Sequence, residues 1–464
     1  MKYSSKTYLL ILIDFISSSI GWILFYCFRK IYIEKTEIVL TTPFYLGVAI
    51  TPLLWMSIYS LQGTYINVRK NYRIVIITKS IIATLIGTMI LFFTLILDDK
   101  IPNYTSLYYS FLALFSLHFL SISIPRYIFT SWQVKNIQKR RDGFKTLLIG
   151  SGDKAEQIFN EINNLILSNG NDIIGFINTN NITNNKTSLP NNLGTITNLK
   201  EIINSQKIEE VIIALESEEH HLLNYLISLL SGCGIIVKII PDDYDLLSGS
   251  LKSTNLFDVL LFEIPLNTMP QWQKSTKRIL DIIIAFFSIL LLSPIYLIIA
   301  FGVKKSSFGP IFYTQERIGK NGTKFNIIKF RTMYLDSEKN GPQLSSTHDN
   351  RITPFGKFLR KTRLDEFPQF INVLKGDMSL VGPRPERQFF IDKISEREPQ
   401  YLQLTSVKPG ITSWGVVKFG YAENIDQMIQ RMKYDLLYLK NRSLALDFKI
   451  MFYTFITIIK AKGK

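Results

Sequence analysis

The sequence predicts a membrane protein in three parts: an N-terminal bundle of four transmembrane helices, a Rossmann-like α/β middle domain and an α/β C-terminal domain. Three observations support this fold class. Long apolar segments are concentrated before residue 126, apolar runs of strand length alternate with helical stretches between residues 143 and 265, and one further apolar run precedes a basic, glycine-containing region. We therefore expect domains at residues 1–126, 143–265 and 271–464.

Composition narrows the function classes. A chain of 464 residues is longer than a single core usually supports, and its net charge of +16 implies anionic partners such as nucleic acid, anionic lipid or phosphorylated substrates. Hydrophobic residues make up 47% of the chain and are unevenly placed, which favours a membrane protein with basic cytoplasmic faces over a nucleic-acid binder. Two cysteines are too few for a disulfide framework.

The N-terminal part contains four apolar segments, each about long enough to cross a ~30 Å hydrocarbon core as a helix. They are Tyr8–Phe28, Val39–Leu61, Ile74–Leu97 and Ser106–Ile124. The loop at residues 69–73 and the segment at residues 126–145 are basic, so the positive-inside rule places the N-terminus, this second loop and everything after Arg126 in the cytoplasm. Three basic residues in the first loop oppose this orientation.

The middle part alternates apolar runs with helical stretches and predicts an open sheet of parallel strands. The runs are Thr146–Ile149, Ile173–Ile177, Val211–Ala214 and Ile235–Ile240. After the first run, Gly150, Gly152 and Ala155 match the spacing of a dinucleotide fingerprint, but the next strand ends in Asn178 and not in an acidic residue. Two interpretations stay open: a dinucleotide site, or glycines that allow close strand–helix packing, and the second is favoured.

The run Ile279–Val303 has the length of a fifth span, yet two features argue against a crossing. Both of its flanks are basic, which holds both ends on the cytoplasmic side. Ser293-Pro294 lies near its middle, where proline removes a backbone hydrogen bond and bends a helix. The sequence therefore predicts a helix that enters one leaflet, turns at Ser293-Pro294 and leaves on the same side. Ser293 is a candidate hydrogen-bond partner for the backbone groups that lose their helical partners at this turn.

Two elements follow this run. Phe312-Tyr313 and Phe325–Phe330 alternate like the strands of a hairpin joined through Gly319–Gly322. The final run, Phe448–Ile459, is too short to span and is flanked by lysines. It predicts a helix lying on the membrane surface, with a packed C-terminal helix as the alternative.

The stretch from residue 351 to residue 386 carries two adjacent carboxylates, Asp365 and Glu366, within a run of cations. Pro368 fits the first turn of a helix that stops at Gly376, so both acids lie at or just before a helix N-terminus, where anions are favoured. A proline-rich turn would hold Arg384 for bidentate phosphate contact. Acids beside fixed cations suit phosphoryl transfer. A capped surface helix in a basic domain explains the pattern equally well.

The segments RKTRLDEFPQ and KGDMSLVGPRPE closely resemble the bacterial sugar transferase family, the monotopic polyprenyl-phosphate sugar-1-phosphate transferases. The resemblance runs from Lys277 to Phe455 and includes the Ser293-Pro294 pair and the motif Lys408-Pro409-Gly410-Ile411-Thr412. It implies a re-entrant membrane helix in the C-terminal domain. Four spans followed by a Rossmann-like module resemble the longer members, in which the module is accessory.

The resemblance implies transfer of a sugar-1-phosphate from a UDP-sugar to undecaprenyl phosphate with release of UMP, the step that initiates exopolysaccharide, capsule or O-antigen synthesis. Asp365 would attack the sugar-bearing phosphorus and form an aspartyl phosphosugar. Glu366 would hold Mg²⁺ on the diphosphate, and Arg384 would clamp phosphate oxygens with support from Arg360 and Lys361. The implied partners are UDP-sugar, undecaprenyl phosphate and lipids of the bacterial inner membrane, with no nucleic acid and with homo-oligomerisation left open.

Further residues carry over with alternatives. Lys329 and Arg331 are implied as phosphate or structural contacts, and Arg331 is equally expected to pair with a carboxylate that fixes the fold. Glu316 is expected in a structural ion pair. The chain departs from the family where Gly-Trp-Ala-Gln is usual, since it has residues 413–416 as Ser-Trp-Gly-Val. This departure weakens the assignment of the sugar: UDP-glucose, UDP-galactose and modified amino sugars stay open, and UDP-glucose or UDP-galactose is favoured.

Two other function classes remain. A membrane-anchored nucleotide-sugar dehydratase or epimerase would use NAD in the middle domain and needs a Tyr-x-x-x-Lys motif in a second Rossmann unit, which the chain from Pro270 onward lacks. A non-catalytic scaffold of envelope polysaccharide assembly would not need an intact Asp365-Glu366 pair with Arg384. The four histidines form no ligand-spaced set with the cysteines, so a zinc site is not indicated.

Overall fold

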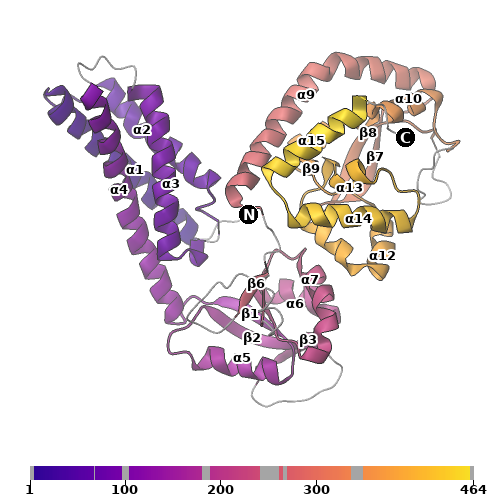
Figure 1. Ribbon diagram of the computed structural model, residues 1–464, viewed down its shortest axis with the longest axis horizontal. Coiled ribbons are helices and arrows are strands. Elements are labelled where there is room, and N and C mark those ends of the chain that lie inside the picture. Colours follow the sequence, from indigo (N-terminus) through magenta and orange to yellow (C-terminus); the bar gives the residue numbers. More distant parts are fainter. Residues whose placement is uncertain are drawn as a thin grey trace. The chain divides into compact units, whose positions relative to one another are not determined.

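A computed structural model describes residues 5–66, 68–96, 104–179, 189–240, 261–264, 269–335 and 349–459 (Figure 1). The chain divides into two compact units, residues 1–142 and 143–464. Among the described residues, five helices are long and apolar enough to cross a membrane. Four of them form the first unit, and the fifth begins the C-terminal part of the second. The chain is therefore a membrane protein that also carries an α/β region.

The first unit is a bundle of long helices: α1 (Ser5–Phe28), α2 (Thr42–Leu61), α3 (Arg73–Leu91) and α4 (Tyr104–Gln138). Short turns follow or join them: η1 (Arg29–Glu34), η2 (Val68–Lys70) and η3 (Phe92–Ile96). Helix α1 packs against α2 and α4, and α3 packs against α4. Leu10, Phe25 and Trp55 fill the centre, whereas many leucines and isoleucines point outward. Apolar residues on both faces are typical of helices surrounded by lipid.

Helix α4 continues beyond the predicted end of the fourth span at Ile124, with a proline in its interior. Arg126, the first residue of the segment that the sequence marks as basic, lies inside this helix and inside the bundle. Its guanidinium is fully buried and donates to both carboxylate oxygens of Asp14, at 2.8 and 2.7 Å. It also donates to the Ser80 hydroxyl at 3.0 Å and lies 3.9 Å from the centre of the Tyr59 ring. Asp14 lies 112 positions from Arg126 in the sequence, so only folding brings the two side chains together.

Ion pairs identify the two ends of the bundle. Asp142, after α4, pairs with Lys6 at the start of α1 and lies 3.6 Å from Arg69 between α2 and α3. These three segments, which the charge pattern assigned to the cytoplasm, therefore lie at one end of the bundle. In the first loop, Glu34 pairs with Arg29 at 2.7 Å. This pairing offsets part of the positive charge that opposed the predicted orientation.

The second unit begins with a six-stranded sheet in the order β3-β2-β1-β4-β5-β6 (Figure 1). The strands are β1 (Phe144–Ile149), β2 (Asn171–Asn178), β3 (Asn192–Thr195), β4 (Glu210–Ile213), β5 (Ile236–Ile239) and β6 (Phe262–Ile264). All neighbours pair in parallel except β5 and β6. The four strands predicted from the sequence correspond to β1, β2, β4 and β5, which confirms that part of the expected fold. The antiparallel β6 at one edge was not predicted.

Helices cover both faces of this sheet. Helix α5 (Asp153–Asn164) packs against Leu148 and Ile212 on one face. On the other face α6 (Leu199–Gln206) and α7 (Leu223–Leu230) pack against Leu147 and Val211, after the short turns η4 (Ile196–Asn198) and η5 (Ser217–Leu222). Adjacent residues of each strand thus point into different cores, as the period of two requires.

The glycines of the predicted fingerprint lie where no side chain fits. Gly150 has φ +129°, and a Cβ there would lie 2.1 Å from the Ala214 carbonyl oxygen. A Cβ on Gly152 would lie 2.2 Å from the carboxylate of Glu216, which accepts a hydrogen bond from the Lys154 N–H at 2.9 Å. The first turn of α5 is thus capped by a carboxylate of the chain itself, which supports the packing interpretation of these glycines.

The C-terminal part begins with α9 (Gln271–Ser306), which Figure 1 shows as one curved helix. The helix runs through Ser293 and Pro294 without a break, and the re-entrant path with its turn at this pair stays a prediction. The predicted role of Ser293 is confirmed. Pro294 has no N–H for the Leu290 carbonyl, and the Ser293 hydroxyl donates to that carbonyl at 2.8 Å.

An antiparallel hairpin follows, made of β7 (Phe312–Ile318) and β8 (Lys324–Phe330) around η6 (Lys320–Gly322), as predicted. Glu316 pairs with Lys324 across it at 3.0 Å, but both side chains are more than half exposed. The remaining elements are α10 (Pro354–Thr362), η7 (Leu364–Glu366), α11 (Gln369–Lys375), β9 (Ser379–Val381), α12 (Gln388–Arg397), η8 (Pro399–Ser406), β10 (Gly410–Thr412), α13 (Trp414–Lys418), α14 (Ile425–Lys440) and α15 (Leu444–Ile459). Strands β9 and β10 pair in parallel.

Helix α15 shows features of both alternatives for the final apolar run. Ile450 is fully buried in a core with β9 and α14, while Phe448, Phe452 and Phe455 are more than half exposed. The helix is therefore packed on one side and apolar on the other. The lysine at position 460 and those after it lie outside the described residues.

Candidate functional site

A cavity of about 610 Å³ opens between the hairpin β7–β8, the segment 360–366, the turn after β9 and the start of α14. This volume lies in the range of sites for cofactors and other small ligands. Its charged lining residues are Arg317, Lys329, Arg331, Arg360, Asp365, Glu366, Arg384, Glu386, Arg387 and Arg431. Among the described lining residues, seven cations stand against three acids, which makes this part of the cavity suited to an anionic ligand.

The paired acids are placed by a short 3₁₀ turn, η7, between α10 and α11. Arg363 ends α10 in the left-handed conformation, with φ 58°, and its N–H donates to the Arg360 carbonyl. A non-glycine residue in this conformation stores strain, which is common at functional sites. After the turn, Pro368 is the N-cap of α11, and Gly376 caps its C-terminal end with φ 95°. The prediction that both acids lie just before a helix is confirmed.

Glu366 is held by two cations. Its Oε1 lies 2.9 Å from Lys329 Nζ and 3.4 Å from an Arg384 nitrogen, and the glutamate is only 6% exposed. Burial by itself opposes ionisation, but the charges of Lys329, Arg384 and Arg363 outweigh it and lower the pKa of Glu366 below its usual range. Glu366 is therefore a permanent anion at physiological pH.

Asp365 has a different environment. It is 8% exposed and accepts no hydrogen bond from the described residues. Burial first, and then the neighbouring Glu366 charge, raise the pKa of Asp365 to about 6, although Lys329 and Arg360 oppose the shift. At neutral pH most Asp365 is thus a desolvated carboxylate facing a cationic cavity, a suitable state for a nucleophile.

The other predicted cations divide into those the fold brings to the cavity and those it does not. Arg360 lines the cavity, and its Nε donates to the Thr332 hydroxyl at 2.9 Å. Lys361, on the same helix, is exposed and is absent from the cavity lining, so the fold does not bring it to the predicted site.

Arg331 forms hydrogen bonds with backbone carbonyl groups. It donates to the carbonyls of Ser307 and Phe308 at 2.7 Å each, just past the end of α9. The hydrogen bonds of Arg331 to described residues reach carbonyl oxygens and not a carboxylate, because the end of a helix presents carbonyl groups that a guanidinium can satisfy. Its position links α9 to the end of β8.

Tyr421 was not predicted from the sequence. It lines the cavity, and the guanidinium groups of Arg363 and Arg384 both lie 5.3 Å from the centre of its ring. Cation–π contacts of this kind hold guanidinium groups in place. Arg317 and Arg387 from neighbouring segments also line the cavity and were not predicted as site residues. No local pattern marks these residues, since they meet only when the chain folds.

The departure from the family pattern at residues 413–416 lies away from the cavity lining. Ser413 caps α13 by accepting from the Val416 N–H at 3.0 Å, and the Gly415 N–H donates to Asp435 at 2.8 Å. Val416 is buried and is not among the cavity-lining residues. Val416 therefore makes no contribution to the described cavity surface.

A divalent cation at this site would need oxygen ligands from its carboxylates. The described residues contain no group of three or more histidine, cysteine, aspartate or glutamate side chains that could hold a metal ion. The recorded bonds to Glu366 from described residues all reach Oε1. One or two carboxylates completed by water and substrate phosphates is the arrangement that Mg²⁺ favours. The residues present thus fit a Mg²⁺ that arrives with a diphosphate, held by Glu366.

Comparison with known proteins agrees with this geometry. The sequence profile of the bacterial sugar transferase family matches residues 272–461. A protein of Haemophilus influenzae described as an uncharacterized sugar transferase is 32% identical over 401 residues, 81% of each chain.

Two further relatives match over the C-terminal part. A UDP-N-acetylgalactosamine-undecaprenyl-phosphate N-acetylgalactosaminephosphotransferase of Aeromonas hydrophila is 45% identical over 187 residues, 40% of this chain and 44% of the relative. A UDP-glucose:undecaprenyl-phosphate glucose-1-phosphate transferase of Escherichia coli is 35% identical over 266 residues, 56% of this chain and 57% of the relative. The chain spans about half the length of these two relatives.

Proposed function

Because the chain belongs to the bacterial sugar transferase family, we propose that it transfers a sugar-1-phosphate from a UDP-sugar to undecaprenyl phosphate and releases UMP. The observation that carries the proposal is the contrast between the two adjacent acids. Glu366 is fixed by cations, whereas Asp365 is an ionised carboxylate without a recorded hydrogen bond from the described residues, facing a cavity of about 610 Å³.

In the first step, a carboxylate oxygen of Asp365 attacks the phosphorus that bears the sugar. A new P–O bond forms as the phosphoanhydride bond breaks, and UMP departs with the electron pair. Arg384 and Lys329 lie within 3.4 Å of the adjacent Glu366 and would neutralise charge on the phosphate oxygens. The product is an aspartyl phosphosugar on Asp365.

In the second step, an oxygen of the polyprenyl phosphate attacks the same phosphorus and displaces the Asp365 carboxylate. The lipid diphosphate-sugar leaves, and the enzyme returns to its starting state. Two steps avoid placing both highly charged phosphate substrates at the reacting phosphorus at once. Arg360 lines the cavity from α10, a helix that packs against the membrane helix α9, and it would position the acceptor phosphate.

Mg²⁺ bound by Glu366 would supply charge neutralisation to the diphosphate and the departing UMP. The chain's own contribution is the placement of Glu366, whose carboxylate is already oriented by Lys329 at 2.9 Å. Chelation should abolish transfer, and added Mg²⁺ should restore it.

The proposed membrane placement is four spans followed by re-entrant α9. Near its start, Lys277 donates to the Val381 carbonyl at 2.9 Å, and near its end Ile299 and Val303 pack against Leu359. Both ends therefore rest on the same C-terminal part, while the side chain of Leu291 between them is 73% exposed. A helix anchored in this way at both ends returns to the side of the membrane from which it entered.

The catalytic part would lie on the cytoplasmic face of the bacterial inner membrane. The bundle supports this topology, because the start of α1, the basic loop before α3 and the end of α4 share one end. Single cysteines introduced by Lys274→Cys and Lys305→Cys, in a chain whose Cys27 and Cys233 are replaced by serine, should both react with reagent from the cytoplasmic side only. Labelling from opposite sides would refute the re-entrant placement.

The donor is proposed to be a UDP-hexose or a UDP-N-acetylhexosamine. The relatives named for N-acetylgalactosamine match at 45% and 42% identity over 187 and 127 residues, and those named for glucose at 35–38% over 182–275 residues. UDP-N-acetylgalactosamine is therefore added to the UDP-glucose and UDP-galactose that the sequence favoured.

The test is UMP release by the purified full-length protein in lipid, supplied with Mg²⁺, undecaprenyl phosphate and each of these UDP-sugars. Donor labelled in the β-phosphate should leave its label on Asp365 when acceptor is withheld. Turnover with no label recovered at this residue would refute the covalent step. No UMP from any donor would refute the transferase assignment and leave the scaffold alternative.

A further inference from the structure

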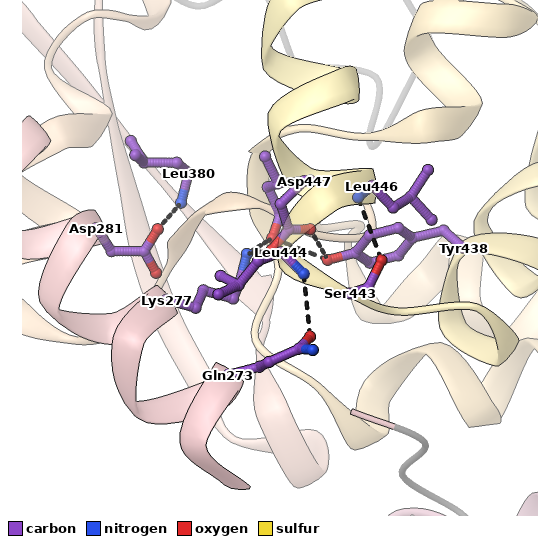
Figure 2. A network of polar contacts seen from close by, with 10 residues as sticks. Gln273, Lys277, Asp281, Leu380, Tyr438, Ser443, Leu444, Leu446 and Asp447 are labelled. Atoms are coloured by element: carbon purple, nitrogen blue, oxygen red, sulfur yellow. Dashed lines mark hydrogen bonds and ion pairs between the residues drawn. The ribbon is translucent and has the colours of Figure 1, made fainter. Parts of the chain in front are cut away.

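A buried polar network joins the start of α9 to α15, α14 and β9, apart from the cavity described above (Figure 2). Lys277 donates to Asp447 Oδ2 at 2.7 Å and to the Val381 carbonyl at 2.9 Å. The Tyr438 hydroxyl donates to the other oxygen of Asp447 at 2.7 Å. All three residues are buried, and none of them lines the cavity.

A second contact of α9 reaches the same strand. Asp281, one turn after Lys277 and 4% exposed, accepts a hydrogen bond from the Leu380 N–H at 3.1 Å (Figure 2). Side chains of α9 therefore hold both a donor and an acceptor of the short strand β9. Three residues make a weak strand, so these contacts matter for its position.

Strand β9 leads directly into the turn that carries Arg384. Gly382 follows Val381, and a Cβ at Gly382 would lie 2.4 Å from the Lys408 carbonyl oxygen. The Gly382 N–H donates to the Thr412 carbonyl at 3.0 Å, so β10 fixes the other side of the turn. Arg384 then reaches Glu366 with only two residues between it and the end of β9.

A buried ion pair is weak support for a purely stabilising role, because the loss of hydration offsets much of the attraction. Its best-attested use is to select one register of packed elements. Here the pair fixes α9 and α15 relative to a backbone carbonyl of β9, which sets the start of the Arg384 turn.

We propose that Lys277, Asp447 and Asp281 are positioning residues that hold Arg384 at Glu366 by fixing β9 to the first turns of α9. The proposal rests on the proposed transferase function, because Arg384 is assigned to the phosphates there. It adds that the membrane helix α9 controls the geometry of the phosphate site through these contacts. Displacing β9 by a fraction of an ångström would misplace the guanidinium and lower the rate without removing a catalytic group.

The test separates positioning from stability by replacing the whole ion pair. Lys277→Met/Asp447→Leu removes both charges and leaves no buried unpaired ion, so the protein is expected to keep its thermal unfolding temperature within a few degrees. Because the Val381 carbonyl loses its donor, kcat/KM should fall about tenfold. In an Arg384→Ala background the same replacement should cause less than a twofold further loss, since the group it positions is gone.

A matched control is Leu439→Ala, which follows Tyr438 on α14 but opens a different hydrophobic core, the one that contains Met432 and Leu436. It should lower the unfolding temperature more than the ion-pair replacement and change kcat/KM by the same factor with or without Arg384. Tyr438→Phe, which removes one hydroxyl and is expected to fold, should give a smaller loss that is also absent in the Arg384→Ala background.

Two results would overturn the proposal: unchanged kcat/KM in the Lys277→Met/Asp447→Leu variant, or equal losses with and without Arg384. The dissociation constant of UDP, measured by calorimetry on the same variants, distinguishes this failure from failure of the proposed function. If the protein binds UDP but transfers no sugar, the UDP affinity of the variants still shows whether the ion-pair replacement acts through Arg384. If the effects of the ion-pair replacement and of Arg384→Ala on UDP affinity are additive, the positioning role is contradicted, and the proposed function is not.

Discussion

Two buried clusters of opposite charges show how similar residues serve different ends. In the N-terminal bundle, Asp14 and Arg126 are fully buried and satisfy one another through two hydrogen bonds. In the cavity, Glu366 is buried at the wall, but its partners Lys329 and Arg384 keep about a fifth of their side chains exposed. The first cluster is closed, and the second is open on the side where a ligand can enter.

The difference teaches what makes an ion pair available for function. A charge fully paired inside the bundle has no capacity for a new partner, and its value lies in joining α1 to α4. The cations at Glu366 line the cavity and have further N–H donors, so they could bind a third group without leaving Glu366. Asp365 completes the contrast as an acid with raised pKa and no recorded hydrogen bond among described residues.

The largest expected effect tests the open cluster. Asp365→Asn keeps the shape of the side chain and removes the nucleophilic oxygen anion, so transfer should fall by about a thousandfold or more. The measurement is UMP release at saturating donor, with thermal unfolding to verify that the protein remains folded. A rate within tenfold of wild type would break the assignment of the nucleophile.

The closed cluster predicts a loss of stability in place of a loss of chemistry. Arg126→Leu leaves Asp14 buried without its partner and should lower the free energy of unfolding by about 3–5 kcal/mol. Replacing both residues by leucine should recover much of this loss, because two apolar residues leave no unpaired charge. Unfolding in detergent by denaturant titration gives both values, and equal stability of the single and double variants would contradict the closed-pair description.

Arg384→Lys sharpens the comparison within the open cluster. Lysine keeps the charge but loses the planar fork and the contact with Tyr421, so kcat/KM should fall by about 10–100-fold. Lys361→Ala is the matched control, because this exposed cation lies outside the cavity and its removal should change kcat/KM less than twofold. A larger loss for the control would mean that position 361 reaches the substrate.

The smallest effect concerns Asp435, a buried acid that accepts from the Gly415 N–H at 2.8 Å. Burial raises the pKa of Asp435 to about 6 against an ordinary value of 3.8, although the Gly415 N–H and Arg431 oppose the shift. A raised carboxyl pKa stabilises the fold below the ordinary value, and this contribution is lost as the pH rises through 6.

Asp435→Asn retains a carbonyl oxygen for Gly415 without titrating. Its unfolding temperature relative to wild type should therefore be higher at pH 7.5 than at pH 4.5, by a few degrees. Measuring both proteins at both pH values cancels the titration of other groups. An identical difference at the two pH values would show that Asp435 does not titrate in this range.

Some features were predictable because their causes are local. The alternating apolar runs gave the hairpin and four of the parallel strands, and the order acid, acid, proline, glycine placed Asp365 and Glu366 before a short helix. The role of Ser293 followed from a rule of covalent structure, since a proline leaves the carbonyl four residues earlier without its donor.

Other features depended on partners far away along the chain. Lys361 and Arg360 are neighbours of the same charge, yet the rotation of α10 sends only Arg360 to the cavity. Arg331 matched a family pattern, but its backbone partners at the end of α9 carry no sequence signature. Tyr421 lies 37 and 58 positions from the two arginines that it contacts, by subtraction of the residue numbers.

By itself the sequence determined which segments are apolar enough to enter a membrane, which runs form strands, and which two acids stand together beside cations. Those properties depend on residues within a few positions of one another. Only the tertiary structure decided that Arg126 closes on Asp14, that Lys277 meets Asp447 across 170 positions, and which cations reach the cavity. The physical reason is that the energy of a charge depends on its surroundings, and for a buried charge those surroundings are assembled from distant parts of the chain.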